Sequence, residues 1–379
     1  MTPWLLVSGD FTPLGGMDRA NHALASYLAR SGEAEVHLVT HRAWPDLEAL
    51  PGLTVHRIPR PLGSHLLGQS LLDLAGRRWA RRLSGRVVVN GGNCRWGDIN
   101  WVHYVHAAWS PRGGPGGGLP RRIKGALATR RFLRDERNAL GRARLVVTNS
   151  ERTRRDVIEN LGVPPDRVHT VYYGADPERF RPPTATERAE ARAMLGWDES
   201  DDRPAIAFVG ALGDARKGFD TLYEAWRHLA DDPGWDARLL VLGAGATLPA
   251  WRARAEVDGL GPSIRFLGFR DDVPRVLAAC DLLVSPTRYE AYGLNVQEAL
   301  CCGLPAIVSA GAGVAERYPE GLRPLLLPDP DDAPDLARRL AAWRADPGPT
   351  REAVADLGRA LRGRGWDRCA AEIVALAGS

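Results

Sequence analysis

The chain has 379 residues, more than a single hydrophobic core usually supports, so we expect two domains. Its 44% hydrophobic and 25% charged residues are typical of a globular protein, and the absence of an apolar run of about 18 residues argues against a membrane span. Charge is unevenly divided: residues 1–183 carry a net charge of +11 and residues 184–379 a net charge of −7, so a partner of the first half would be anionic.

The cysteines and lysines add two constraints. Five cysteines, an odd number without the paired spacing of a metal site, predict reduced and buried thiols and make a zinc site improbable. The first ten residues lack the basic start of a signal peptide, and we therefore expect a cytoplasmic protein. Only Lys124 and Lys217 are lysines among 50 basic residues, and a lysine kept in so arginine-rich a chain can mark a need for a compact ammonium group.

The chain opens with a buried strand at residues 4–7, a loop that ends in Gly15 and Gly16, and a helix over residues 17–30. A strand, a glycine pair and a helix N-terminus together can hold a phosphate group. Tight turns also use glycine for purely steric reasons, so the residues alone leave both interpretations open.

Strands and helices then alternate, which predicts a parallel sheet covered on both faces. We expect strands at residues 36–40, 54–58 and 86–89. An amphipathic helix at 66–83 lies between the last two of them. A strand over 99–106 carries His103 and His106, which point to opposite faces because they are three residues apart. His106 lies nearer the carboxyl end, where ligands bind in such sheets, although a lone histidine is usually structural.

A glycine- and proline-rich stretch at 110–120 leads into a strongly basic helix. Between Arg112 and Arg144 there are ten basic residues and two acidic ones. The segment is either a solvated helix face or a surface for an anionic membrane or a phosphorylated acceptor, with the glycine-rich stretch as a movable lid. It lacks the interleaved aromatic residues that nucleic acid binding would favour, so we expect no nucleic acid partner.

Strands at 144–150 and 167–173 complete the first sheet, and the proline-rich residues 173–183 form a linker by composition. A helix at 187–195 and a strand at 204–210 open the second domain. The loop after this strand carries two adjacent cations, Arg216 and Lys217.

Two further motifs in this half have structural interpretations. Residues 239–248 begin like a dinucleotide fingerprint, but Leu248 stands where its third glycine belongs. The Asp-x-Asp at 329–331 lies in a proline-rich acidic turn and is interpreted as a loop.

Residues 281–309 are the most informative stretch. A short apolar strand at 282–285 is followed by a turn and by a helix that should begin near Leu294, because Gly293 lets the backbone turn and leaves the first amides uncovered. Such a helix end attracts phosphate. Glu298 lies four residues further, roughly 6 Å along the helix axis, which is about the distance from phosphate to ribose in a nucleotide. Glu290 lies in the loop before the helix.

Together with Pro286, Gly303 and Pro305, these residues make the block resemble the signature of retaining glycosyltransferases of family 4, which have the GT-B fold. The resemblance implies an α/β protein of two Rossmann-like domains whose parallel sheets face across a cleft. The corresponding divisions are an N-terminal acceptor domain at 1–174, a linker at 175–186, a donor domain at 187–350, and C-terminal helices at 351–379 that pack back toward the first domain.

The resemblance also implies the site. Glu290, His106 and Lys217 match the catalytic positions, and Gly16 matches a glycine beside the donor phosphate or the acceptor. The implied donor-binding residues are Gly16, Arg216, Lys217, Phe269, Arg270, Glu290, Tyr292, Gly293, Leu294, Asn295 and Glu298. The family has an arginine where this chain has Ala211, and Arg216 is a candidate substitute for the missing charge.

By resemblance, the reaction is transfer of a hexosyl group, with retained configuration, from a nucleotide-diphosphate sugar to a hydroxyl of a glycan, a lipid-linked or a small-molecule acceptor. No metal and no other cofactor is expected. Peripheral contact with the inner face of an anionic membrane through residues 112–144 is a further expectation. The alternatives are another GT-B enzyme, such as a sugar-nucleotide epimerase or a phosphorylase, and a nucleotide-sugar-binding protein that has lost catalysis.

Overall fold

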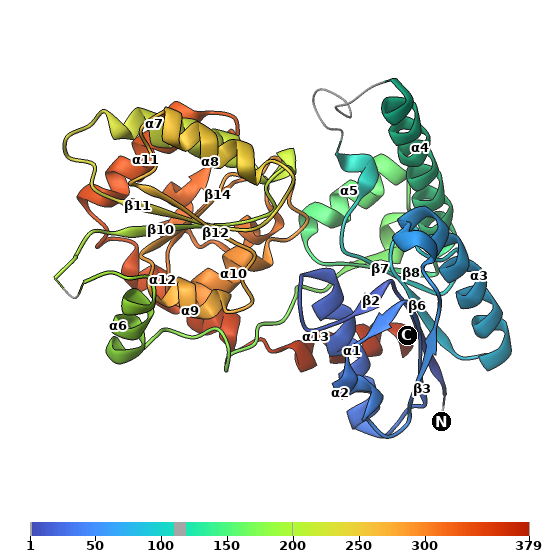
Figure 1. Ribbon diagram of the computed structural model, residues 1–379. Helices are drawn as coiled ribbons and strands as arrows, with labels where there is room; N and C mark the ends of the chain where they lie inside the picture. Colours follow the sequence, from blue (N-terminus) through green and yellow to red (C-terminus); the bar gives the residue numbers. More distant parts are fainter. Residues whose placement is uncertain (1, 110–118, 199, 379) are drawn as a thin grey trace. The chain divides into compact units, whose positions relative to one another are not determined.

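The computed structural model describes residues 2–109, 119–198 and 200–378. The chain forms two compact units: Met1–Gly174 with Trp366–Ser379 make up unit 1, and Ala175–Gly365 make up unit 2. Each unit is a parallel sheet with helices on both faces (Figure 1), which confirms the predicted α/β class and the two parallel sheets.

The sheet of unit 1 has seven parallel strands in the order β5-β3-β1-β6-β7-β8-β9. They are β1 (Trp4–Val7), β3 (Val36–Thr40), β5 (Leu53–Arg57), β6 (Arg86–Val89), β7 (Ile99–Val102), β8 (Leu145–Thr148) and β9 (Val168–Thr170). The order reverses between β1 and β6, and ligands of open α/β sheets bind at the carboxyl ends of the strands at such a switch point.

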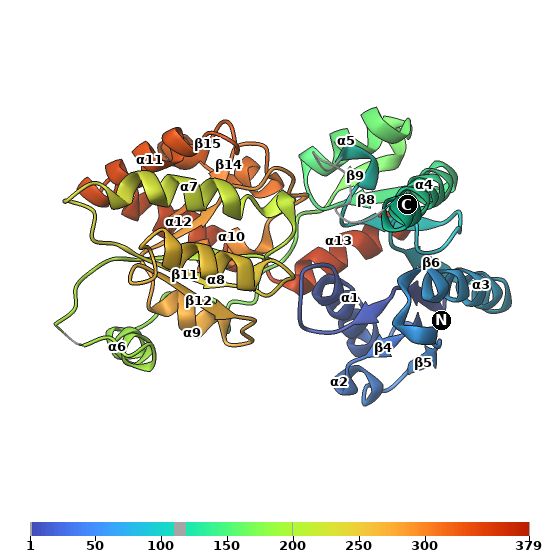
Figure 2. The ribbon, with the colours of Figure 1, turned by 45° about the horizontal axis from the view of Figure 1, so that its top comes forward.

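Helices cover both faces of this sheet. α1 (Met17–Ser31) and α13 (Trp366–Gly378) lie side by side on one face, and α3 (His65–Leu83) covers the other (Figures 1 and 2). The remaining elements are α2 (Pro45–Glu48), α4 (Leu119–Arg142), α5 (Glu151–Leu161) and the small parallel pair β2 (Asp10–Phe11) and β4 (Arg42–Ala43). None of the described helices is both long enough and apolar enough to cross a membrane.

Unit 2 repeats the same plan with six parallel strands in the order β12-β11-β10-β13-β14-β15. They are β10 (Ala205–Val209), β11 (Arg238–Leu242), β12 (Ile264–Gly268), β13 (Leu282–Ser285), β14 (Ala306–Ser309) and β15 (Leu326–Leu327). The central strands are mostly apolar and buried, with polar residues only at their ends, as expected of a parallel sheet covered on both faces. The switch point here lies between β10 and β13.

The helices of unit 2 also form two layers. α7 (Phe219–Ala230) and α11 (Ala333–Ala345) pack together on one face, while α10 (Leu294–Cys301) and α12 (Arg351–Arg362) pack together on the other (Figure 1). The other helices are α6 (Ala185–Met194), α8 (Leu248–Val257) and α9 (Val273–Ala278). All five cysteines are free and buried, as predicted.

Two boundaries differ from the expectation. The strand expected over 99–106 ends at Val102. The helix expected over 351–376 is two helices, of which only α13 belongs to unit 1. α12 stays in unit 2 because Gly358 lets it touch α10 directly: a Cβ there would lie 2.3 Å from the carbonyl oxygen of Leu300. The expected lid at 110–120 falls largely outside the described residues.

Candidate active site

The switch point of unit 2 brings two loops and one helix end together. Asn295, in the first turn of α10, donates a hydrogen bond from Nδ2 to the carbonyl oxygen of Val209 at 3.0 Å and lies 3.5 Å from Ser285 Oγ. Val209 ends β10 and Ser285 ends β13, so one side chain ties the helix to both strand ends. Its side-chain N–H groups are used in this way, and its backbone N–H remains for a ligand.

Glycine at position 218 lets the two loops touch. Gly218 has φ +65°, and a Cβ there would lie 1.9 Å from the carbonyl oxygen of Pro286. The backbone N–H of Arg288 also donates to the carbonyl oxygen of Arg216 at 2.7 Å. No other residue fits at position 218 without moving a loop, so the backbone beside Lys217 is held against the loop after β13.

Lys217 and Glu290, which are 73 residues apart in the chain, meet at this point. Lys217 Nζ lies 2.6 Å from Glu290 Oε2, and the two side chains are 24% and 19% exposed. In the absence of a ligand, the two charges neutralise each other. Both side chains are nevertheless exposed enough for a ligand to reach them. The structure therefore brings together the two unit 2 residues for which the sequence predicts a catalytic role.

The N-terminus of α10 lies directly after this loop. Gly293 has φ +112°, and a Cβ there would lie 2.9 Å from Val314 Cγ1, so glycine is required. No described residue accepts a hydrogen bond from the amide groups of Leu294 or Asn295. These two N–H groups and the helix dipole make the end of α10 suitable for an anion. Glu298 follows in the next turn and is partly exposed.

Three predicted donor-binding side chains are already engaged by other residues. Arg216 pairs with Asp214, whose Oδ1 lies 2.9 Å from the guanidinium Nε. Arg270 donates from Nε to Asp272 Oδ1 at 2.7 Å. Tyr292 is buried and hydrogen-bonds to the side chain of Gln297.

The ion pair of Arg216 with Asp214 affects whether Arg216 can replace the arginine that is missing at position 211. Burial works to raise the pKa of Asp214, but the hydrogen bonds and charge of Arg216 outweigh it and hold this pKa below its ordinary value. Arg216 therefore already has a counter-ion, and its role as a substitute for the missing arginine stays a prediction. Ala211 is exposed and leaves its position without a cation.

Phe269 is the one predicted donor-binding residue with a large exposed apolar side chain, at 72% exposure. It follows β12, which lies two strands from β10 in the sheet. Neighbouring strands are about 4.8 Å apart, so β12 is roughly 10 Å from the switch point. That separation suits the base of a nucleotide whose phosphates bind at the end of α10.

The two misleading motifs of this unit have structural explanations. A Cβ at Gly243 would lie 1.9 Å from the carbonyl oxygen of Gly210, and a Cβ at Gly245 would lie 1.4 Å from that of Leu212. These glycines therefore allow two strand-end loops to pack together. In the Asp-x-Asp turn, the carboxylate of Asp331 pairs with Arg288 at 2.5 Å.

In unit 1, His106 is held by a buried carboxylate. Its Nδ1 lies 3.0 Å from Glu136 Oε1, and the same carboxylate accepts the backbone N–H groups of His106 at 2.8 Å and of Ala107 at 3.1 Å. Because the carboxylate accepts the backbone N–H groups, Nδ1 is the donor in this contact, and in the neutral ring Nε2 is then an acceptor. The imidazole is 51% exposed, whereas Glu136 is 1% exposed. The buried carboxylate therefore holds the ring in place while the ring itself stays accessible.

His103, in contrast, has a structural role in the core. Its Nδ1 lies 2.5 Å from the hydroxyl oxygen of Tyr173, and its Nε2 lies 3.0 Å from Asn90 Nδ2. Complete burial lowers the pKa of His103 to about 3, so the ring is neutral in the core. Both histidines lie beyond the end of β7, so their different surroundings come from the loop rather than from strand alternation.

Gly16 directly precedes α1, as predicted, but acidic groups lie close by. Burial, and then the carboxylate of Asp10, raise the pKa of Asp18 to about 6, against a smaller effect of Arg42. Negative charge beside this helix end disfavours a phosphate and favours hydroxyl groups. The predicted contact between Gly16 and the ligand stays a prediction.

Sequence reasoning missed Glu136 and Asp18. The signal for Glu136 was present, because Asp135 and Glu136 are the two acidic residues in the basic run from Arg112 to Arg144. A lone buried carboxylate in such a helix needs a partner, and His106 is that partner. Nothing in the sequence around Asp18 indicated that Asp10 would fold back toward it.

Comparisons with known proteins agree with this geometry. A family model described as "Glycosyltransferase Family 4" matches residues 14–179, and one described as "Glycosyl transferases group 1" matches residues 203–346. The chain is 29% identical to the D-inositol 3-phosphate glycosyltransferase of Xylanimonas cellulosilytica, over 95% of this chain and 90% of that protein. It is 31% identical to the 2-deoxystreptamine glucosyltransferase of Streptomyces kanamyceticus, over 61% of this chain and 57% of that protein.

Solved structures share the fold over the full length. WaaG, a glycosyltransferase involved in lipopolysaccharide biosynthesis, superimposes with a TM-score of 0.78 at 20% identity, over 99% of both chains. Anabaena HepE in complex with UDP-glucose superimposes with a TM-score of 0.71 at 18% identity, over 99% of this chain and 100% of that one. Since the two family models together span most of both units, the chain belongs to the group 1 glycosyltransferases of family 4, with the GT-B fold.

Proposed function

We propose that the protein transfers a hexosyl group from a nucleotide-diphosphate sugar to an acceptor hydroxyl, with retained configuration and without a metal ion. The observation that carries this proposal is the 2.6 Å pair of Lys217 and Glu290 beside the open N-terminus of α10. Structural neighbours solved with UDP-glucose and with ADP support a nucleotide sugar as donor. The relatives named above are glycosyltransferases, which supports transfer over epimerisation or phosphorolysis.

The leaving diphosphate is the group that this site suits best. As the anomeric bond breaks, negative charge builds on the diphosphate, and Lys217 with the amide groups of Leu294 and Asn295 would stabilise it. These groups supply the positive charge that a metal ion supplies elsewhere. A donor held in this way would also draw Lys217 away from Glu290.

Glu290 would then be free to act on the sugar. Its carboxylate would accept hydrogen bonds from sugar hydroxyls and offset the positive charge that develops at the anomeric carbon. Glu298, one turn into α10, would accept from the ribose hydroxyls, and Phe269 would contact the base. In unit 1, His106 Nε2 would accept a hydrogen bond from a hydroxyl of the sugar or the acceptor.

The proposed function does not choose among glycans, lipid-linked molecules and small molecules as the acceptor. Contact of residues 112–144 with an anionic membrane also stays a prediction, because part of that segment lies outside the described residues. Co-sedimentation with anionic vesicles tests it.

Hydrolysis of the donor tests the proposal without a known acceptor, because water can replace the acceptor hydroxyl. UDP-, GDP- and ADP-hexoses would be incubated with the protein in EDTA, and proton NMR would follow the first-formed anomer of the released sugar. We expect one donor to be cleaved with its anomeric configuration kept. An inverted product, or cleavage only after a divalent metal is added, would overturn the proposed mechanism, and an epimerised donor would favour the rival class of enzyme.

A further inference from the structure

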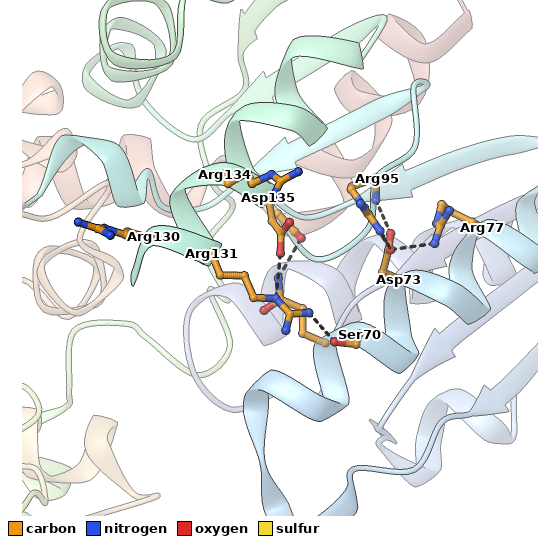
Figure 3. A pocket seen from close by; sticks show the side chains of 10 residues that line it. Ser70, Asp73, Arg77, Arg95, Arg130, Arg131, Arg134 and Asp135 are labelled. Atoms are coloured by element: carbon orange, nitrogen blue, oxygen red, sulfur yellow. Dashed lines mark hydrogen bonds and ion pairs between the residues drawn. The ribbon is translucent and has the colours of Figure 1, made fainter. Parts of the chain in front are cut away.

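Unit 1 contains a strongly basic cavity of about 560 Å³ between α3, the segment after β6, and α4 (Figure 3). Its arginines are Arg77, Arg95, Arg130, Arg131 and Arg134. Two aspartates are the acidic residues that line it, so the lining carries a net charge of +3. The volume is in the range of cavities that hold small ligands.

One wall of the cavity is fixed by Asp73. Arg95 Nη2 lies 2.7 Å and Arg77 Nη2 3.1 Å from Asp73 Oδ2, and the two guanidinium groups converge on this carboxylate (Figure 3). Burial works to raise the pKa of Asp73, but the hydrogen bonds and charge of Arg95, with Arg77, hold it below its ordinary value. One ionised carboxylate therefore serves two cations, and positive charge is left over on this wall.

The opposite wall is formed by α4. Arg131 extends toward α3, where its Nη2 lies 2.5 Å from Ser70 Oγ, and its Nε lies 3.5 Å from Asp135 Oδ2 (Figure 3). Arg130 and Arg134 are exposed, and no described residue forms an ion pair or a hydrogen bond with either side chain. Within the described part of the chain, these two guanidinium groups therefore have no partner, although Arg130 extends away from the other labelled side chains in Figure 3.

The cavity lies at the carboxyl end of β6, next to the switch point of this sheet, where ligands of α/β proteins bind. Gly92 lines it and lies against α4, since a Cβ at position 92 would be 2.9 Å from the backbone nitrogen of Glu136. Asp135 lines the cavity, and the next residue, Glu136, holds His106. One turn of α4 therefore joins the cavity to the histidine expected beside the transferred sugar.

We propose that this arginine pocket binds a phosphate group carried by the acceptor. Guanidinium groups bind phosphate through paired, charge-assisted hydrogen bonds, and a surplus of them in a concave site favours an oxyanion over a neutral sugar. The cavity is large enough for a monosaccharide phosphate. The identification of the bound molecule as the acceptor rests on the proposed glycosyltransferase function. The presence of an anion site does not depend on that function.

The test compares Arg134→Gln with Arg137→Gln. Both residues are exposed arginines of α4 without an ion pair or a hydrogen bond to any described residue, but only Arg134 lines the cavity. Calorimetric titration would use inorganic phosphate and glucose 6-phosphate, with glucose as the neutral control. Co-sedimentation with phosphatidylglycerol and phosphatidylcholine vesicles would test a lipid headgroup as the source of the phosphate. Circular dichroism would show that each variant is folded.

We expect saturable binding of glucose 6-phosphate to the wild-type protein, no binding of glucose, and at least tenfold weaker binding to Arg134→Gln. Arg137→Gln should bind within about twofold of the wild type. Equal weakening in both variants, no saturable binding in the wild type, or binding only to phosphatidylglycerol vesicles would overturn the assignment.

Titration of the same preparations with UDP, GDP and ADP separates this inference from the proposed function. Nucleotide binding without binding of glucose 6-phosphate would refute the pocket and leave the donor site standing. Binding of glucose 6-phosphate without binding of any nucleotide would refute the proposed function and leave the anion site standing.

Discussion

The two sheets share one strand order over six strands, with a seventh strand added at one edge in unit 1, but they carry different chemistry at their switch points. In unit 2, a lysine and a glutamate meet beside an open helix end, which suits a diphosphate and the sugar attached to it. In unit 1, the helix start after Gly16 has acidic neighbours, and the positive charge lies instead in the pocket of α3 and α4. The comparison shows that topology decides where a ligand can bind, and that the side chains decide which ligand it is.

The glycines of the two switch points differ in the same way. A Cβ at Gly218 would lie 1.9 Å from the carbonyl oxygen of Pro286, whereas a Cβ at Gly15 would meet nothing closer than Asp18 Oδ2 at 3.9 Å. The glycine in unit 2 locks two loops together, while the one in unit 1 provides a turn with φ +80°. Similar glycine loops in a sequence can therefore mark a rigid site or only a tight bend.

The largest effect should come from breaking the pair in unit 2. Lys217→Ala should lower kcat/KM for transfer by roughly 10²–10³, because the leaving diphosphate loses its ammonium partner. Lys217→Arg should not restore activity, since a planar guanidinium does not reproduce the compact ammonium group that lies 2.6 Å from Glu290 Oε2. Steady-state kinetics with the identified donor measures both variants.

Arg216→Ala is the control for this prediction. It should cost less than tenfold, because Asp214 already holds the arginine. A larger loss for Arg216→Ala than for Lys217→Ala would reverse the assignment of the two cations.

Glu136→Gln tests the corresponding arrangement in unit 1. The amide side chain can no longer accept in the same way from the ring and from two backbone N–H groups, so His106 should lose its fixed orientation. We expect kcat to fall by roughly 10- to 100-fold while nucleotide affinity stays within about twofold. Glu159→Gln, at an exposed glutamate of α5, should leave both unchanged. Equal losses in kcat and in nucleotide affinity would show a general structural defect instead.

Ala211→Arg sharpens the comparison by adding charge to the donor site. Ala211 is exposed, so an arginine fits there without displacing a neighbour. We expect donor affinity to rise by roughly three- to tenfold, about 1 kcal/mol, which calorimetry with the nucleoside diphosphate would detect. Weaker binding would show that this family member holds the diphosphate in another way.

The smallest effect is on stability. In the folded protein the pKa of Asp18 is raised to about 6. The folded state therefore binds a proton more tightly than the unfolded chain, and the ionised carboxylate increasingly lowers the free energy of unfolding as the pH rises from about 4 to about 6. Above about pH 6 this destabilisation is complete. Asp18→Asn should therefore raise Tm at pH 7.5 by about 2–4 °C, a gain near 1 kcal/mol after solvent screening. The gain should shrink below pH 6 and disappear near pH 4. A gain that does not change with pH would point to packing rather than to charge.

Much of the fold could be read from the sequence, because strands such as 4–7, 36–40 and 86–89 are short, mostly apolar runs and the start of α10 is marked by Gly293. The break between α12 and α13 was missed, although Gly363 and Gly365 stand between the two helices, because apolar residues at helical spacing continue on either side of it. In the site, the family resemblance singles out Lys217 and Glu290, whereas their ion pair is a finding of the structure. Contacts such as that of Glu136 with His106 and of Arg216 with Asp214 depend on side-chain directions that spacing does not specify.

Thermal unfolding in EDTA with UDP-, GDP- and ADP-hexoses tests the central claim, a metal-free donor site at the switch point of unit 2, most directly. At 100 times its dissociation constant, a bound donor should add about 2.7 kcal/mol of stability. We predict a clear rise in Tm with one nucleotide in the wild type and little or none in Glu298→Ala. A rise that requires a divalent metal, or no rise with any of the three, would contradict the account.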